Sequence, residues 1–111
     1  MYDYNVLCGA SSYTKQFYLN EQFEGLPEGI KEELKIMCVL YTEDVGGVLT
    51  LRFDEDGTLL FDTTYEEDDY FYDEIGSVLK IKQMQKNKQE LLESLETYYK
   101  VFFLGEDFDE E

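Results

Sequence analysis

The hydrophobic positions of the first half of the chain predict a β-hairpin followed by a helix. Residues 4–8 and 13–19 have the composition of strands, and the sequence Gly-Ala-Ser-Ser at positions 9–12 predicts the turn between them. After a linker that holds Pro27, apolar residues trace one helix face at Ile30, Leu34, Met37, Cys38 and Tyr41. Ile36, Val39 and Leu40 widen this stripe, so we expect the end of the helix to be buried on most sides. Gly46 and Gly47 then end the helix.

The second half repeats the order of hairpin and helix. Residues 48–53 and 58–65 alternate as strands do, and Asp56-Gly57 supplies a turn. From Ile75 to Leu104 the pattern is helical, either as one long helix or as two joined near Asn87, where charged residues interrupt the apolar spacing. Its second part carries one apolar face, formed by Leu91, Leu92, Leu95, Tyr98, Tyr99, Phe102 and Phe103. Burying such a face contributes on the order of 10–20 kcal/mol before entropy is subtracted, so it must pack against something.

These elements predict an α+β fold with the order β-β-α-β-β-α. The simplest layered arrangement is an antiparallel sheet of about four strands, formed by the two hairpins, with both helices on one face. We expect residues 1–105 to form a single domain, and residues 106–111 to form an acidic, flexible tail.

The charge of the chain excludes several classes of function. Its 111 residues include 26 acids, nine bases and no histidine, for a net charge of −17. Such a field repels phosphate, so we expect neither direct nucleic-acid binding nor membrane binding. The absence of histidine removes the most common general base and zinc ligand. We therefore expect a protein that is not an enzyme and that holds no cofactor or metal.

Compartment and metal chemistry are constrained by few residues. Cys8 and Cys38 form neither a metal-ligand pattern nor a disulfide framework. Together with the lack of a basic, apolar leader, they predict a cytoplasmic protein with buried, reduced thiols. The stretch Asp54-Glu55-Asp56-Gly57 begins like a calcium loop, but Tyr65 stands where the motif needs its glutamate. A hairpin turn accounts for the same residues.

The most acidic window, residues 62–74, surrounds the aromatic triplet Tyr70-Phe71-Tyr72. It is either a solvated loop or a contact surface for a basic partner, whose candidate residues are Glu66, Glu67, Asp68, Asp69, Tyr70 and Tyr72. At its end, Asp73 and Glu74 suit the positive end of a helix dipole.

Four of the nine basic residues lie in a segment without acids, residues 77–89, at Lys80, Lys82, Lys86 and Lys88. Their spacing spreads them over a broad helix face instead of forming a compact phosphate clamp. They either neutralise the acidic window of the same chain or simply stay solvated, or they dock an acidic partner or the acidic tail of a second copy.

Several stretches resemble a family of small acidic proteins of unknown function from anaerobic Gram-positive bacteria. They are CGASSY at residues 8–13, EELKIMCVLYTEDVGGVLTL at residues 32–51, DEIGSVLKIKQ at residues 73–83 and ELLESL at residues 90–95. The resemblance implies a free-standing bacterial domain, and it supplies no catalytic or ligand residues.

Two functional hypotheses follow. The first is a non-enzymatic, cytoplasmic binding or regulatory protein whose acidic surface meets a basic protein partner. The alternative is a structural or assembly module that forms a homodimer through the aromatic helix at residues 91–103, with the lysine segment meeting acids of the second copy.

Overall fold

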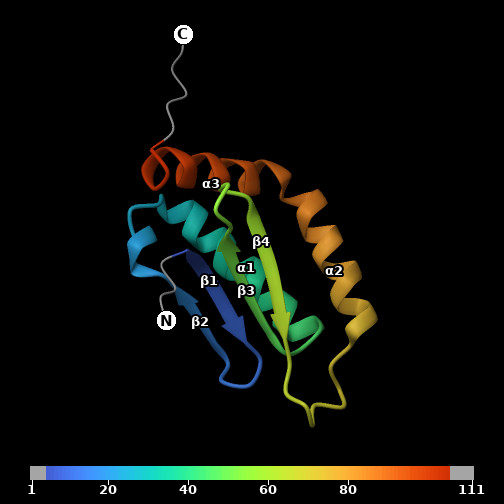
Figure 1. Ribbon diagram of the computed structural model, residues 1–111. Helices are drawn as coiled ribbons and strands as arrows, with labels where there is room; N and C mark the ends of the chain where they lie inside the picture. Colours follow the sequence, from blue (N-terminus) through green and yellow to red (C-terminus); the bar gives the residue numbers. More distant parts are fainter. Residues whose placement is uncertain (1–4, 106–111) are drawn as a thin grey trace.

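The computed structural model describes residues 5–105 as a four-stranded antiparallel sheet with helices, which confirms the α+β prediction (Figure 1). The strands lie in the order β2-β1-β3-β4, so the second hairpin joins the first through β1 and β3. In chain order the elements are β1 (Val6–Ser11), β2 (Gln16–Leu19), a 3₁₀ turn (Glu21–Phe23), α1 (Glu28–Asp44), β3 (Val48–Phe53), β4 (Leu59–Thr64), α2 (Glu74–Asn87) and α3 (Gln89–Phe102).

One face of the sheet forms the core. Along β3, Leu49, Leu51 and Phe53 are fully buried, and the pairing places Cys8 opposite Leu51 on the same face. Helix α1 packs on this face through Cys38, whose sulfur lies 3.9 Å from that of Cys8. Helix α3 crosses over the end of the sheet near the β3–β4 turn (Figure 1). It meets the same face, because the Tyr99 ring stacks on Phe53 at 4.1 Å. The prediction that both helices cover one face is therefore confirmed.

The predicted turn at residues 9–12 is wrong. Strand β1 continues through Gly9 to Ser11, and the turn follows at residues 12–15. At Gly9 the neighbouring strand approaches closely, since a Cβ there would lie 3.0 Å from the Leu49 carbonyl oxygen. The Ser11 hydroxyl instead begins the turn by accepting hydrogen bonds from the Tyr13 and Thr14 amides. Gly9 is therefore the residue at which two backbones approach closely, and it does not mark a turn.

Helix α1 starts after Pro27 and ends before Gly46, as predicted. The expectation that its last turns would be buried on most sides is wrong, because Ile36 is 53% exposed and Leu40 47% exposed. Only one side of the helix is buried, the side that packs against the sheet, and its buried residues are Leu34, Met37, Cys38, Tyr41 and Thr42. The outer side of α1 is therefore left with an apolar strip.

Residues 75–104 form two helices that meet at Lys88, which resolves the alternative of one helix or two. The aromatic stripe of α3 packs as expected at Leu91, Leu92, Leu95 and Tyr99, all of which are buried. Phe102 is the exception, with 70% of its surface exposed. The chain leaves the helix after Phe102, and Phe103 is the side chain that stacks on Phe23, at 4.8 Å.

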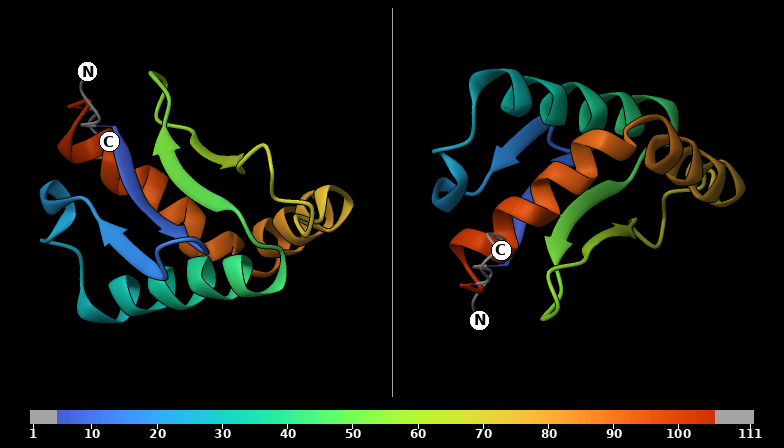
Figure 2. Two further views of the ribbon diagram at one scale, coloured as in Figure 1. Left: turned by 90° about the horizontal axis from the view of Figure 1, so that it is seen from below. Right: turned by 90° about the horizontal axis from the view of Figure 1, so that it is seen from above.

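The buried side chains of residues 5–105 form one hydrophobic cluster between the sheet, α1 and α3. Helix α2 lies beside β4 at the edge of the molecule, opposite β2 (Figures 1 and 2). Only Ser77 and Met84 of α2 are buried, with Ile81 partly so. The tail predicted at residues 106–111 lies outside the described residues.

Candidate interaction surface

The acidic window becomes a loop, residues 65–73, between β4 and α2; we call it the acidic loop. It lies at the same end of the sheet as the β1–β2 turn (Figure 1), and Tyr13 from that turn braces it. The Tyr13 hydroxyl donates to the Asp69 carboxylate at 2.6 Å and accepts from the Glu66 amide at 3.0 Å. Partial burial and the bond to Asp69 raise the pKa of Tyr13. One tyrosine far away in sequence therefore fixes both ends of the acidic tip.

The other end of the acidic loop is anchored to the core by Tyr72. Its ring stacks on Tyr65 at 4.2 Å, and its hydroxyl shares a hydrogen bond of 3.0 Å with that of Tyr41. Tyr41 is fully buried and also bonds the Ser77 hydroxyl of α2, at 2.7 Å. Burial is the main cause of the strongly raised pKa of Tyr41. Tyr72, predicted as a contact residue, is thus held inward by a network that joins α1, the acidic loop and α2.

Space for the Tyr72 ring depends on Gly47. This residue has a φ of +70°, and a Cβ there would lie 2.6 Å from the Tyr72 ring and 2.7 Å from the Thr64 carbonyl oxygen. The glycine pair that ends α1 therefore also lets the aromatic anchor of the acidic loop approach the backbone.

The tip of the acidic loop presents two aromatic rings to solvent. Tyr70 is 88% exposed and Phe71 is 96% exposed. Phe71 is held in place through its backbone, whose amide donates to the Asp69 carboxylate at 3.0 Å. Glu66, Glu67 and Asp68 are exposed beside them and form no ion pair with any residue in the range 5–105. The structure thus brings the predicted acids together with two unburied rings.

The start of α2 follows the expected dipole chemistry. The Asp73 carboxylate caps the helix by accepting from the Gly76 amide at 2.9 Å. Glu74 in the first turn accepts a hydrogen bond from the Tyr65 hydroxyl, and this bond is the main cause of the raised pKa of Tyr65. Both acids therefore contact groups of their own chain, in contrast to Glu66, Glu67 and Asp68, although the Glu74 carboxylate has acceptor sites beyond the one that Tyr65 uses.

The four predicted lysines divide into two pairs. Lys80 pairs with Asp44 at 2.8 Å and Lys88 pairs with Glu33 at 3.3 Å, so both tie α2 to α1. Lys82 and Lys86 are exposed, with no ion pair to any described residue. The segment neutralises acids of α1, and not the acidic loop.

An apolar groove of about 260 Å³ lies between α1 and α2. Ile36, Met37, Leu40 and Met84 line it, with Lys80 and Lys88 at its borders. This groove was not predicted, since the periodicity of α1 predicted that Ile36 and Leu40 would be covered.

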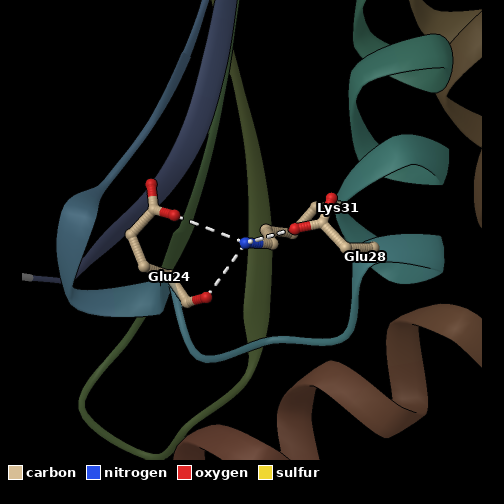
Figure 3. Close-up of polar contacts among 3 residues, drawn as sticks. All are labelled: Glu24, Glu28 and Lys31. Carbon is tan, nitrogen blue, oxygen red and sulfur yellow. Dashed lines mark hydrogen bonds and ion pairs between the residues drawn. The ribbon is translucent and has the colours of Figure 1, made fainter.

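Lys31 is likewise used inside the fold. Its ammonium group contacts the Glu24 carboxylate at 3.3 Å, the Glu24 carbonyl oxygen at 3.0 Å and Glu28 at 3.2 Å (Figure 3). These contacts, led by the one to Glu28, raise the pKa of Lys31 and join the 3₁₀ turn to the start of α1. Arg52 similarly pairs with Asp62 across β3 and β4. With Lys80 and Lys88 also paired, four of the nine basic residues of the chain are engaged by its own acids.

The side chains that could react or bind a metal take part in packing and hydrogen bonds within the fold. Cys8 and Cys38 are free and buried, and the hydrogen bond between the two thiols, together with burial, raises the pKa of Cys8. The Asp54 carboxylate accepts from the Asp56 and Thr58 amides, each at 2.9 Å, so the hairpin interpretation of this segment is confirmed. Within residues 5–105, no three acids or cysteines cluster as metal ligands, and no helix is long and apolar enough to cross a membrane.

Besides the groove, the sequence did not predict three features of the surface: the brace from Tyr13, the exposure of Phe71, and an apolar strip on α2 formed by Ile75, Val78 and Leu79. Phe71 lies in an aromatic triplet flanked by Asp69 and Asp73, and this acidic setting is a local signal of its exposure. The partner of Tyr13 is 56 residues away, and no local pattern identifies it.

Comparison with known proteins gives one match. A family model described as a family of unknown function (DUF6145) matches residues 4–107. No curated protein and no solved structure has a significant match to the chain. The expectation of a family of unknown function is confirmed, and the match carries no activity, ligand or partner.

Proposed function

Since the chain belongs to this family of unknown function (DUF6145), we propose from its surface that it is a non-enzymatic protein-binding module that contacts a basic protein partner through the acidic loop. The observation that carries the proposal is the braced display of Tyr70 and Phe71, 88% and 96% exposed, beside Glu66, Glu67 and Asp68. We place the protein in the cytoplasm, a location supported by two adjacent thiols that are free.

The acids and the exposed rings of the acidic loop contribute differently to binding. The net charge of −17 attracts a basic partner and speeds its encounter, while adding little to affinity once salt screens the field. Affinity requires apolar anchors, and burying a ring such as Phe71 contributes about 1.5–3 kcal/mol. The partner that fits is therefore a protein whose basic surface also contains an apolar pocket.

A merely solvated loop is the simpler alternative. Such a loop does not need hydrogen bonds that fix its carboxylates, yet Asp69 bonds both the Tyr13 hydroxyl and the Phe71 amide. Tyr70 and Phe71 are also adjacent in the sequence and both almost fully exposed, so the loop presents a pair of rings instead of a single scattered one. These two features favour a preorganised contact surface, which lowers the entropic cost of binding.

The alternative of a homodimer through α3 is less favoured. Leu91, Leu92, Leu95 and Tyr99 are buried in the core of their own chain. Phe102 remains exposed on that helix, but a single ring is a small contact compared with the aromatic face that the hypothesis required.

The test uses a synthetic amphipathic peptide of lysine and leucine, with a matched peptide in which glutamate replaces lysine. Fluorescence anisotropy measures their affinities. We expect the basic peptide alone to bind, and Phe71→Ala to weaken it at least about fivefold. Replacing Glu66, Glu67 and Asp68 by Gln, Gln and Asn weakens it at least about tenfold.

The matched control removes the same charge elsewhere. Glu32, Glu55 and Glu90 are exposed acids on α1, in the β3–β4 turn and on α3, and their joint replacement by glutamine changes the net charge equally. We expect an effect within about threefold for this control, because a general field is largely screened in physiological salt. Equal losses for both triple variants would mean that the peptide senses only net charge, which would overturn the proposal.

A further inference from the structure

The outer face of α2 carries an apolar strip that no described element covers. Ile75, Val78 and Leu79 are 76%, 56% and 63% exposed. Ser77 and Met84 face the core from the opposite side of the helix. Helix α2 stands at the edge of the molecule, and its outer side faces away from the sheet and from α1 (Figures 1 and 2). Among residues 5–105 the strip is therefore uncovered and open to a partner.

Charge is segregated along this outer face. Glu74 and the exposed acids of the acidic loop precede the strip, whereas Lys82 and Lys86 follow it without an ion pair to any described residue. No acid occurs from Ile75 to Gln89. One end of the helix is thus acidic and the other basic, with apolar residues in between.

This order is self-complementary. Glu74 lies four positions before Val78 and Lys82 lies four positions after it. At a spacing of four, all three lie along one line of the helix surface, about 6 Å apart. When two such helices run antiparallel and cross at Val78, each Glu74 meets the Lys82 of the other copy. The two Leu79 and Ile75 side chains then flank the crossing, as a two-fold interface requires.

We propose that two copies of the chain pair antiparallel through the outer faces of α2. Ile75, Val78 and Leu79 form the apolar centre, and Glu74 and Lys82 pair across the two-fold axis. Lys86 extends toward the exposed acids of the other copy's acidic loop. The pairing uses α2 and leaves α3 in its own core, so it differs from the arrangement predicted from the sequence. It does not depend on the proposed function, whose test uses a peptide and the acidic loop.

Sedimentation equilibrium without any peptide tests the pairing. At about 100 μM protein in 0.15 M and 0.5 M NaCl, we expect a mass of two 13.1 kDa chains. Leu79→Glu weakens association at least about tenfold. Phe102→Glu on α3 is the matched control, since it also changes an exposed apolar residue, and it leaves association unchanged. A wild-type chain that stays monomeric at several hundred micromolar, or equal effects of the two substitutions, would overturn the proposal.

A charge exchange tests the antiparallel register. Lys82→Glu and Glu74→Lys each weaken self-association, because each homodimer then has like charges across the axis. Mixing the two variants restores pairing as a heterodimer, because each crossing again joins opposite charges. If the mixture associates no better than the separate variants, the register is wrong. If Leu79→Glu weakens binding of the basic peptide and leaves the dimer intact, the strip belongs to the partner surface, and the pairing is excluded.

Discussion

Replacing Tyr41 by phenylalanine removes the hydroxyl that links α1, the acidic loop and α2. The change preserves the buried ring and deletes two hydrogen bonds, to Tyr72 at 3.0 Å and to Ser77 at 2.7 Å. A hydrogen bond contributes about 0.5–1.5 kcal/mol net, and Ser77 remains buried without this partner. We therefore expect the free energy of unfolding to fall by about 1–3 kcal/mol.

Urea denaturation followed by circular dichroism measures this loss. Tyr18→Phe is the control, because Tyr18 lies on the solvent face of the sheet at 51% exposure and no hydrogen bond of its hydroxyl is found among the described residues. We expect the control to change stability by less than about 0.5 kcal/mol. If Tyr41→Phe is no more damaging than Tyr18→Phe, the hydroxyl network does not hold the acidic loop and α2 in place.

The difference in stability between wild type and Tyr41→Phe should also depend on pH, and the direction of that dependence can be worked out. Burial raises the pKa of Tyr41 in the folded state above the ordinary value of about 10. Below pH 10 both the folded and the unfolded states keep the phenolic proton, and the stabilisation is complete. Above pH 10 only the unfolded state releases it, so the contribution falls by about 1.4 kcal/mol per pH unit. The stability difference between wild type and Tyr41→Phe should shrink by about 1 kcal/mol from pH 10 to pH 11, where the unfolded tyrosine goes from half to almost fully ionised, and a constant difference would contradict the reasoning.

Two pairs of substitutions and one thiol reaction test the packing. Gly47→Ala should destabilise the fold by about 1–3 kcal/mol in urea denaturation, because its φ is +70° and Tyr72 occupies the space of a Cβ. Gly29→Ala in α1, where a Cβ meets nothing within 4 Å, should instead stabilise by about 0.5–1 kcal/mol; the same sign for both would refute the reasoning. Phe23→Ala removes a fully buried ring and should cost about 3–5 kcal/mol by thermal denaturation, against less than about 1 kcal/mol for exposed Phe102→Ala. The buried Cys8 thiol should react with an aromatic disulfide reagent at least about 100-fold more slowly in the native than in the denatured protein, and comparable rates would show that it is accessible.

Periodicity predicted the elements that bury a face of their own. Leu34, Cys38 and Tyr41 repeat at helical spacing and lie in the core, and Leu49, Leu51 and Phe53 alternate as the sheet requires. These signals come from residues close together in the chain, so a single sequence is enough to predict the helices and strands. The sheet order β2-β1-β3-β4 is not local, because the pairing of β1 with β3 depends on contacts between distant segments.

The sequence predicted which residues belong to the candidate surface, but it did not predict how they are arranged in space. The sequence identified Glu66, Glu67 and Asp68 as a charged group, but their relation to Tyr13 depends on the β1–β2 turn reaching the acidic loop. The exposure of Ile36 was also unpredictable, since the periodicity of a helix shows which residues are apolar and not how many sides its neighbours cover. Phe102 is exposed for a different reason, because the helix ends there and the next residue takes its place in the core.

The most direct test of the proposed function is the location of the bound basic peptide. Amide chemical shifts of the ¹⁵N-labelled protein, followed while the lysine and leucine peptide is added, report that location residue by residue. We predict that the largest shifts occur in residues 65–73 and that the glutamate peptide produces none. Shifts centred on the exposed acids of α1 and α3, or spread evenly over the chain, would contradict the assignment of the acidic loop as the contact surface.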